Sequence, residues 1–206
     1  MKIAALDLGS NSFLCLICEC DPLENTLINS NKSDESKYTI KNIISDQVEI
    51  VRLGEKISST QIFQDSALER ADACLQKFSK TIQEHRPDKI IAVATAAARM
   101  AKNSEKLFQI CQKYKIPLKI ISGDEEARIT YLGSISKIAH IPVYALSSFV
   151  VIDIGGASTE IIWGDHNKIF WKKSFPVGGV KLTETLLQEQ PSQNWEYKKN
   201  EVENFL

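Results

Sequence analysis

Ala5-Leu-Asp-Leu-Gly-Ser-Asn-Ser12 and Val151-Ile-Asp-Ile-Gly-Gly-Ala-Ser158 are two copies of one pattern. In each copy an apolar strand ends near an aspartate, a glycine turn follows, and a second apolar strand begins. Two copies so far apart in the sequence indicate two similar lobes, because a solenoid repeats its unit every few tens of residues. The repeat therefore predicts a duplicated fold with a cleft between the lobes.

The sequence between the copies alternates strand and helix patterns, which is typical of an α/β fold. Strands are expected at 48–53, 89–94 and 118–121, and helices at 59–85, 104–114 and 123–139. Residues 24–46 are rich in Asn, Ser, Asp and Lys, and we expect them to form a long surface hairpin or mobile loop.

The second copy opens a smaller set of elements. Strands are expected at 149–153, 159–163 and 168–175, and helices at 178–189 and 194–206. We therefore expect a first lobe at 1–128, followed by a linker helix and a partial second lobe at 129–206. Because so little sequence follows the second copy, we expect the chain to be truncated or to be the N-terminal part of a longer protein.

The sheet of the second lobe is expected to be only half covered. Such sheets usually carry helices on both faces, and few residues follow Phe175 to supply them. An exposed apolar face marks a missing partner surface, so we expect this lobe to be stabilised by another chain or to be poorly stable alone. The apolar residues concerned include Ile152, Ile154, Ile161 and Trp163.

Composition sets broad limits on function. The 206 residues are 43% hydrophobic and carry a net charge of −1, so a packed core is feasible and the basic excess of a general nucleic-acid binder is missing. Asp7 interrupts any signal-peptide core, and no apolar run is long enough to span a bilayer. We expect a cytoplasmic protein with no membrane partner. Its five irregularly spaced cysteines indicate buried, reduced thiols.

The two glycine turns are candidate phosphate sites. A concave turn presents backbone N–H groups that bind phosphate oxygens without a charged side chain, and a serine hydroxyl adds a donor. Asp7 and Asp153, at the strand ends, can hold a divalent cation through water, as Mg²⁺ prefers. Two matched turns that face each other would place phosphate in the cleft. The first turn is Gly9, Ser10, Asn11 and Ser12, and the second is Gly155, Gly156, Ala157 and Ser158.

A third motif, Ile121-Ser-Gly-Asp-Glu-Glu-Ala-Arg128, joins a strand to a helix. Ser122 and Glu125 have the spacing of a capping box, which would give Glu125 a structural role. Glu126 is not needed for the cap, and its carboxylate could take a proton from a water molecule that attacks phosphorus. The helix N-terminus favours the ionised form that a base requires. The alternative is that Glu126 is an ordinary solvated carboxylate of the first turn.

Five motifs together resemble the exopolyphosphatase / guanosine pentaphosphate phosphatase family. They are Asp7-Leu-Gly-Ser-Asn-Ser12, Thr95-Ala-Ala-Ala-Arg99, Ser122-Gly-Asp-Glu-Glu-Ala-Arg128, Asp153-Ile-Gly-Gly-Ala-Ser-Thr-Glu160 and Val177-Gly-Gly-Val-Lys-Leu-Thr-Glu184. The resemblance covers the chain apart from 24–46 and 192–206, and implies the two-lobed actin-like (ribonuclease H-like) fold. It also implies a phosphohydrolase that uses Mg²⁺ to release the terminal phosphate of inorganic polyphosphate, of guanosine pentaphosphate, or of both.

The same resemblance implies roles for single residues. Glu126 would be the catalytic base, and Arg99 would be a clamp on phosphate. Asp153 would position magnesium or water, with Glu160 near the metal, although a salt bridge inside the sheet is an alternative for Glu160. Lys181 would lie near the phosphate chain, or would be a surface lysine.

Ala157 departs from the family pattern, which has a third loop glycine there, and a residue with a side chain adopts positive φ only at a cost. Two other functions remain open. Sugar and acetate kinases share the fold and transfer phosphate from ATP, and a non-catalytic sensor could bind phosphate or an alarmone in the same cleft. The resemblance further implies pairing into a homodimer.

Overall fold

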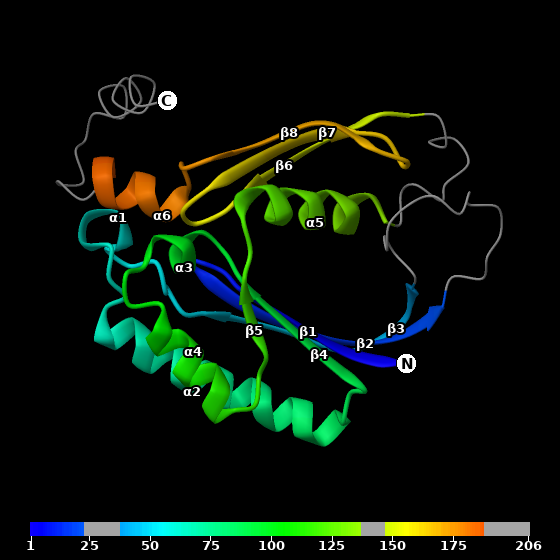
Figure 1. Ribbon diagram of the computed structural model, residues 1–206, viewed down its shortest axis with the longest axis horizontal. Coiled ribbons are helices and arrows are strands. Elements are labelled where there is room, and N and C mark those ends of the chain that lie inside the picture. The colour runs from blue at the N-terminus through cyan, green and yellow to red at the C-terminus, as the bar shows by residue number, and fades with distance from the viewer. Residues whose placement is uncertain (23–37, 137–146, 188–206) are drawn as a thin grey trace.

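The two lobes predicted from the repeat are present as two stacked sheets. The computed structural model of the protein describes residues 1–22, 38–136 and 147–187. Figure 1 shows a five-stranded sheet with α2 (Asp65–His85) and α4 (Glu105–Lys113) below it, and a three-stranded sheet above it. Helix α5 (Gly123–Ile135) lies between the layers, beneath the second sheet. The α/β class is confirmed.

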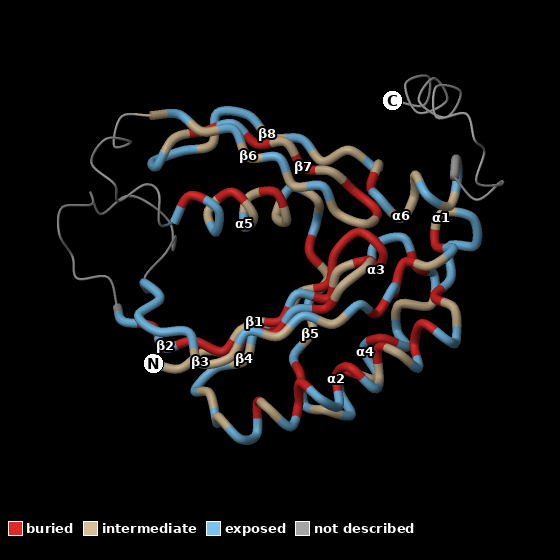
Figure 2. Tube along the Cα trace, turned by 180° about the vertical axis from the view of Figure 1, so that it is seen from behind, coloured by how far each residue is buried: buried red, intermediate tan, exposed pale blue. Residues whose placement is uncertain are grey.

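The first sheet has the strand order β3-β2-β1-β4-β5. β1 and β3 each run antiparallel to β2, whereas β4 is parallel to β1, and β5 to β4. Leu6 and Leu8 of β1 are buried in one core with Leu75 and Phe78 of α2, and Figure 2 shows buried residues along both elements. The strands are β1 (Lys2–Leu8), β2 (Ser12–Pro22), β3 (Tyr38–Ile50), β4 (Lys89–Ala94) and β5 (Leu118–Ile120).

Of the two forms expected for 24–46, a hairpin or a mobile loop, the hairpin is confirmed for residues 38–46, because they belong to β3, which pairs antiparallel with β2. Residues 23–37 lie outside the described part. β3 pairs with β2 along its length, from Ser12↔Ile50 to Pro22↔Tyr38. It is an edge strand, and backbone hydrogen bonds rather than side-chain burial hold it to the sheet. Its polar composition is therefore compatible with a strand at the edge of the sheet.

The single helix predicted at 59–85 is two helices, α1 (Ile57–Thr60) and α2. Gln61 has a left-handed φ of 54°, which ends α1. Before α2 begins, Phe63 N donates to Asn103 Oδ1 at 2.8 Å. This partner is distant in the sequence, so the local pattern could not show the break. A further short helix, α3 (Ala96–Met100), was not predicted.

The second sheet has the order β6-β7-β8, with both pairs antiparallel. Its strands β6 (Phe149–Ile154), β7 (Thr159–Gly164) and β8 (Ile169–Phe175) confirm the three predicted strands. The helix expected at 178–189 begins as α6 (Gly179–Leu182) and continues as the π-helical turn η3 (Thr183–Leu187). The helix expected at 194–206 lies outside the described residues.

Helix α5 joins the two lobes. It follows β5 of the first sheet, and its Tyr131 and Ile135 pack with Ile162 on one face of the second sheet. The boundary predicted after residue 128 falls within this helix and stays a prediction.

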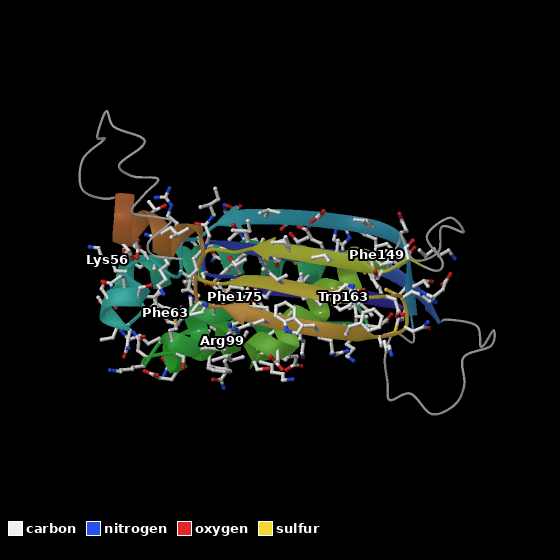
Figure 3. The ribbon with its side chains drawn as sticks, turned by 90° about the horizontal axis from the view of Figure 1, so that it is seen from above. Lys56, Phe63, Arg99, Phe149, Trp163 and Phe175 are labelled. Atoms are coloured by element: carbon white, nitrogen blue, oxygen red, sulfur yellow. The ribbon has the colours of Figure 1, made fainter. Side chains whose placement is uncertain are left out.

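The other face of the second sheet is exposed, as expected. Ile152 is 60% exposed and Ile154 is 72% exposed, although their counterparts in the repeat, Leu6 and Leu8, are 2% and 1% exposed. Trp163 lies on this outer face, which Figure 3 views from above. Among the described residues, the second sheet has no strands equivalent to β4 and β5 and no helices equivalent to α2 and α4.

Two expectations from composition concern the cysteines and the membrane. All five cysteines are buried free thiols, which confirms the prediction. None of the helices in the described ranges is long and apolar enough to cross a membrane.

Candidate active site

The two glycine turns have the same backbone geometry. Gly9 N donates to Ser12 O at 3.0 Å, and Gly155 N donates to Ser158 O at 2.9 Å. A Cβ atom on either glycine would crowd that carbonyl oxygen, at 2.9 Å in the first turn and 3.1 Å in the second. The repeat in the sequence is therefore a repeat in structure, and it brings the aspartate of each copy to the same place in its lobe.

The turns touch each other between the lobes. A Cβ atom on Gly156 would lie 3.2 Å from Ser10 Cβ and 3.3 Å from Asn11 Cβ. A Cβ atom on Gly178 would lie only 2.5 Å from the carbonyl carbon of Gly156, which is backbone and cannot easily move aside. Close approach, and not an unusual φ, therefore requires glycine at Gly178 and leaves little room for a side chain at Gly156. It also explains why Gly178 follows the second sheet.

Ala157 causes no backbone strain in the second turn. It is buried, and it is not among the non-glycine residues with positive φ. Within the described ranges, no glycine has a positive φ either. The departure from the family's third loop glycine is therefore compatible with the turn.

A cavity of about 940 Å³ is lined by both turns and walled by both lobes. Cavities of this size hold small-molecule ligands. Every residue predicted for the site lines it except Arg99 and Lys181. The further lining residues, which the sequence did not single out for the site, are Leu14, Arg52, Glu55, Thr95, Ile154, Gly179, Val180, Thr183 and Glu184.

Glu126 reaches this cavity from the first turn of α5. Half of the predicted capping box is present: Ser122 Oγ accepts from Glu125 N at 3.1 Å, while the Glu125 carboxylate pairs with Lys119 at 2.8 Å. Glu126 Oε2 instead accepts a hydrogen bond from Arg99 Nη1 at 2.7 Å. The two neighbouring glutamates thus have separate partners, and only Glu126 lines the cavity.

The surroundings of Glu126 raise the pKa of its carboxyl above the ordinary value. Burial is the main cause and the charges of Glu160 and Asp7 add to it, whereas the hydrogen bond from Arg99 lowers this pKa. A carboxylate with a raised pKa is a stronger base than a solvated one. Glu126 is therefore suited to accept a proton from water.

Comparisons with known proteins agree with this geometry. Residues 31–204 match the model of the Ppx/GppA phosphatase family. The chain belongs to this family. Exopolyphosphatase 2 of Mycobacterium tuberculosis is 30% identical over 196 residues, which cover 92% of this chain and 56% of that protein. The bifunctional 3-dehydroquinate synthase/phosphatase of Fusobacterium nucleatum is 33% identical over 184 residues, which cover 88% of this chain and 26% of that protein.

A solved structure extends the match to three dimensions. An exopolyphosphatase from Cytophaga hutchinsonii superposes with a TM-score of 0.79 at 25% identity, covering 100% of this chain and 59% of that one. This likeness confirms the two-lobed actin-like fold. The chain spans less than two thirds of the length of each of these Ppx/GppA relatives.

Two residues predicted from the Ppx/GppA resemblance lie outside the cavity lining. Arg99 lies beside Glu126, and its Nη1 also donates to Ile121 O at 3.0 Å. Lys181 Nζ donates to Pro176 O at 2.6 Å. The roles of Arg99 and Lys181 toward phosphate stay predictions.

Glu160 lines the cavity although only 1% of it is exposed. Its carboxylate accepts a hydrogen bond from Ser174 Oγ at 2.7 Å, and it forms no ion pair with any described residue. The salt bridge considered as an alternative is therefore not found in the sheet. A carboxylate with one such bond keeps lone pairs for a ligand.

Asp7 and Asp153 both line the cavity, and the charge of Asp153 acts on the carboxyl of Asp7. Asp7 is exposed to solvent at the cavity wall, but partial desolvation by the surrounding protein, and to a smaller extent the charge of Asp153, raise its pKa to about 6, as expected for a carboxylate without a cationic partner. No group of three or more His, Cys, Asp or Glu side chains in the described part is arranged to hold a metal by itself. Mg²⁺ fits this arrangement, because it keeps several waters and takes one or two carboxylates together with substrate phosphates.

Arg52 and Glu184 are polar lining residues to which the sequence analysis assigned no role. Glu184 Oε1 accepts from Lys56 N at 2.7 Å, so η3 is tied to the start of α1 where α1 and α6 lie side by side (Figure 1). The sequence does give a signal for Glu184, which ends the motif Val177-Gly-Gly-Val-Lys-Leu-Thr-Glu184. No local sequence signal marks Arg52, because it reaches the cavity through a contact between the segment after β3 and the first turn, in which Arg52 N donates to Asn11 O.

Proposed function

We propose that this protein hydrolyses the terminal phosphoanhydride of inorganic polyphosphate. The observation that carries the proposal is the contact between the two glycine turns, which line one cavity together with Glu126. The relatives named exopolyphosphatase support this substrate class. The remaining length of those relatives is not matched by this chain, so the proposal rests on the cavity described above.

The chain's own groups can carry the reaction. The two turns hold the end of the phosphate chain through backbone N–H groups. Glu126 accepts a proton from a water molecule while the oxygen of that water bonds to the terminal phosphorus. The bond from that phosphorus to the bridging oxygen breaks, and the shortened chain leaves with the oxygen. The products are orthophosphate and a chain one unit shorter, and no covalent enzyme intermediate is needed.

Asp7, Asp153 and Glu160 are the residues that would hold Mg²⁺, directly or through water. When bound, the cation neutralises charge that develops on the phosphoryl oxygens. A positive charge beside Asp7 would also lower the pKa of that carboxyl. The excess of carboxylates around the turns is therefore consistent with a site that takes phosphate together with a metal.

Glu126→Gln tests the proposal. The amide keeps the shape of the side chain, and loss of a general base should lower phosphate release from polyphosphate by roughly a hundredfold or more. Glu125→Gln is the matched control, because it changes the adjacent carboxylate that pairs with Lys119 outside the cavity. Equal rates for wild type and Glu126→Gln would remove Glu126 as the base.

The same assay separates the other functions. Turnover of ATP in preference to polyphosphate would indicate a phosphotransferase of the sugar or acetate kinase type, and binding without turnover would indicate a sensor. Guanosine pentaphosphate is compared under the same conditions, because it offers the same kind of terminal phosphoanhydride. Sizing of the purified protein tests the homodimer that the family resemblance implies.

A further inference from the structure

The cavity carries a large excess of negative charge. Among its described lining residues, Arg52 has the only cationic side chain. A polyphosphate chain is itself a polyanion, so its binding requires positive charge close by. The carboxylates that line the cavity are Asp7, Glu55, Glu126, Asp153, Glu160 and Glu184.

Three other cations near the site already have partners. Arg99 is hydrogen-bonded to the candidate base, and Lys181 donates to a backbone carbonyl. Arg70 pairs with Glu55 at 2.7 Å. Arg52, in contrast, is exposed, and its guanidinium makes no hydrogen bond or ion pair with any described residue. Its donors are therefore available to a ligand in the cavity.

The backbone of Arg52 is fixed on the first glycine turn. Its N–H donates to Asn11 O at 2.8 Å, and Val51 N donates to the same oxygen at 2.9 Å. Arg70 Nε donates to Val51 O at 2.7 Å and holds the segment from its other side. Arg52 has a φ of 53°, a left-handed conformation that is uncommon for a residue with a side chain. The side chain thus starts from an anchored position beside a phosphate-binding turn.

We propose that Arg52 binds a phosphate group of the substrate directly. A planar guanidinium donates two parallel N–H bonds to phosphate oxygens, a geometry that the ammonium of lysine cannot reproduce. The choice of substrate rests on the proposed function, but the role concerns binding and not proton transfer. Arg52 therefore contributes to affinity for the phosphate chain and little to the acid–base step.

Calorimetric titration of the full chain with tripolyphosphate tests this role. Arg52→Ala should weaken binding roughly tenfold or more, as expected for loss of a charge-assisted pair. Arg52→Lys should recover part of the affinity. Arg86→Ala is the matched control, because Arg86 is also an exposed arginine with a left-handed φ of 48° but lies outside this cavity. It should bind tripolyphosphate as wild type does.

Kinetics supply a second readout. With polyphosphate, Arg52→Ala should raise KM while kcat is kept, and the difference from wild type should shrink at high salt. The proposal is overturned if Arg52→Ala binds tripolyphosphate as tightly as wild type does. It is also overturned if Arg86→Ala loses as much affinity as Arg52→Ala, or if the wild type does not bind tripolyphosphate. A wild type that binds through Arg52 but releases no phosphate refutes the proposed function and supports this binding role.

Discussion

Arg99 Nη1 donates a hydrogen bond to Glu126 Oε2 at 2.7 Å, and the same nitrogen donates to Ile121 O at 3.0 Å. Both side chains of the pair are largely shielded, with 26% of Arg99 and 15% of Glu126 exposed. A guanidinium that is held by a backbone carbonyl and a carboxylate restricts the orientation of both. Arg99 is thus placed to orient the candidate base, whereas the family resemblance implied a clamp on phosphate.

Arg99→Ala should shift the pH dependence of hydrolysis. The hydrogen bond from Arg99 lowers the pKa of Glu126 against the raising effect of burial, so its loss should raise that pKa further. A base works only in its ionised form, so the acid limb of the kcat/KM profile should move to higher pH. The measurement is phosphate release from polyphosphate over a pH series.

Lys119→Ala is the control for this shift. It breaks the neighbouring pair with Glu125, which lies outside the cavity, and should leave the acid limb where it is in wild type. A raised KM for Arg99→Ala with an unmoved acid limb would favour the phosphate clamp over the orienting role.

Asp153→Ala should raise the Mg²⁺ concentration that gives half of maximal activity. Asp153 lies at the end of β6, opposite Glu160 of β7, so its backbone pairing survives the change. Loss of one of the carboxylates proposed to hold Mg²⁺ should weaken the binding of a cation that is coordinated mainly through water. Binding of Mn²⁺, followed by electron paramagnetic resonance, gives a readout that does not depend on turnover.

Asp46→Ala is the matched control, because Asp46 is an exposed aspartate on β3 outside the cavity. It should leave both measurements unchanged. If Asp153→Ala behaves in the same way as this control, Asp153 does not belong to the metal site.

The turns of the site could be predicted from the sequence because their requirements are local. The tight turn from Gly9 to Ser12 needs glycine because a Cβ atom on residue 9 would lie 2.9 Å from Ser12 O, and the same residue types recur at Gly155 and Ser158. Arg52 had no such signature. It belongs to the site because its N–H bonds to Asn11 O, a contact between segments that no local pattern reveals.

The helices and strands around the site show the same difference between features that local sequence determines and features that depend on tertiary contacts. The interior strand β4 was predicted from its apolar run, although only Ala92 and Ala94 of it are buried and Ile91 is 41% exposed. For the first part of β3 the sequence left a hairpin and a mobile loop open, because an edge strand needs backbone pairing more than apolar side chains. The end of α1 at Gln61 was missed because the contact that follows it, from Phe63 to Asn103, is tertiary.

Gly178→Ala should damage both stability and activity. Its Cβ atom would meet backbone atoms of Gly155 and Gly156 at 2.5–2.6 Å, so the second turn must shift. Overpacking of this kind costs roughly 1–3 kcal/mol, and the displaced turn should lower kcat/KM for polyphosphate. Urea unfolding and phosphate release measure the two effects.

Gly133→Ala is the matched control for this substitution. Gly133 is exposed in α5, and a Cβ atom there would meet nothing within 4 Å. Alanine should therefore stabilise the helix by up to about 1 kcal/mol and leave activity unchanged. A Gly178→Ala protein as stable and active as Gly133→Ala would show that the second turn tolerates the added atom.

Leu6 and Ile152 occupy the same position of the repeat but differ in burial, at 2% and 60% exposed. Leu6→Ala removes buried methyl groups and leaves a cavity, so it should cost about 2–5 kcal/mol of unfolding free energy. Ile152→Ala removes atoms that already face solvent, so it should cost less than about 0.5 kcal/mol. Urea unfolding of the two variants, followed by circular dichroism, makes the comparison.

The size of the Ile152→Ala effect also reports whether the outer face of the second sheet is covered in solution. A loss as large as that of Leu6→Ala would contradict the exposed face and would mean that other groups pack on Ile152. If those groups belong to a second copy of the chain, the unfolding midpoint should rise with protein concentration, because association stabilises the folded state by mass action. A small loss with a midpoint that is independent of concentration would show that this face stays open in the isolated protein.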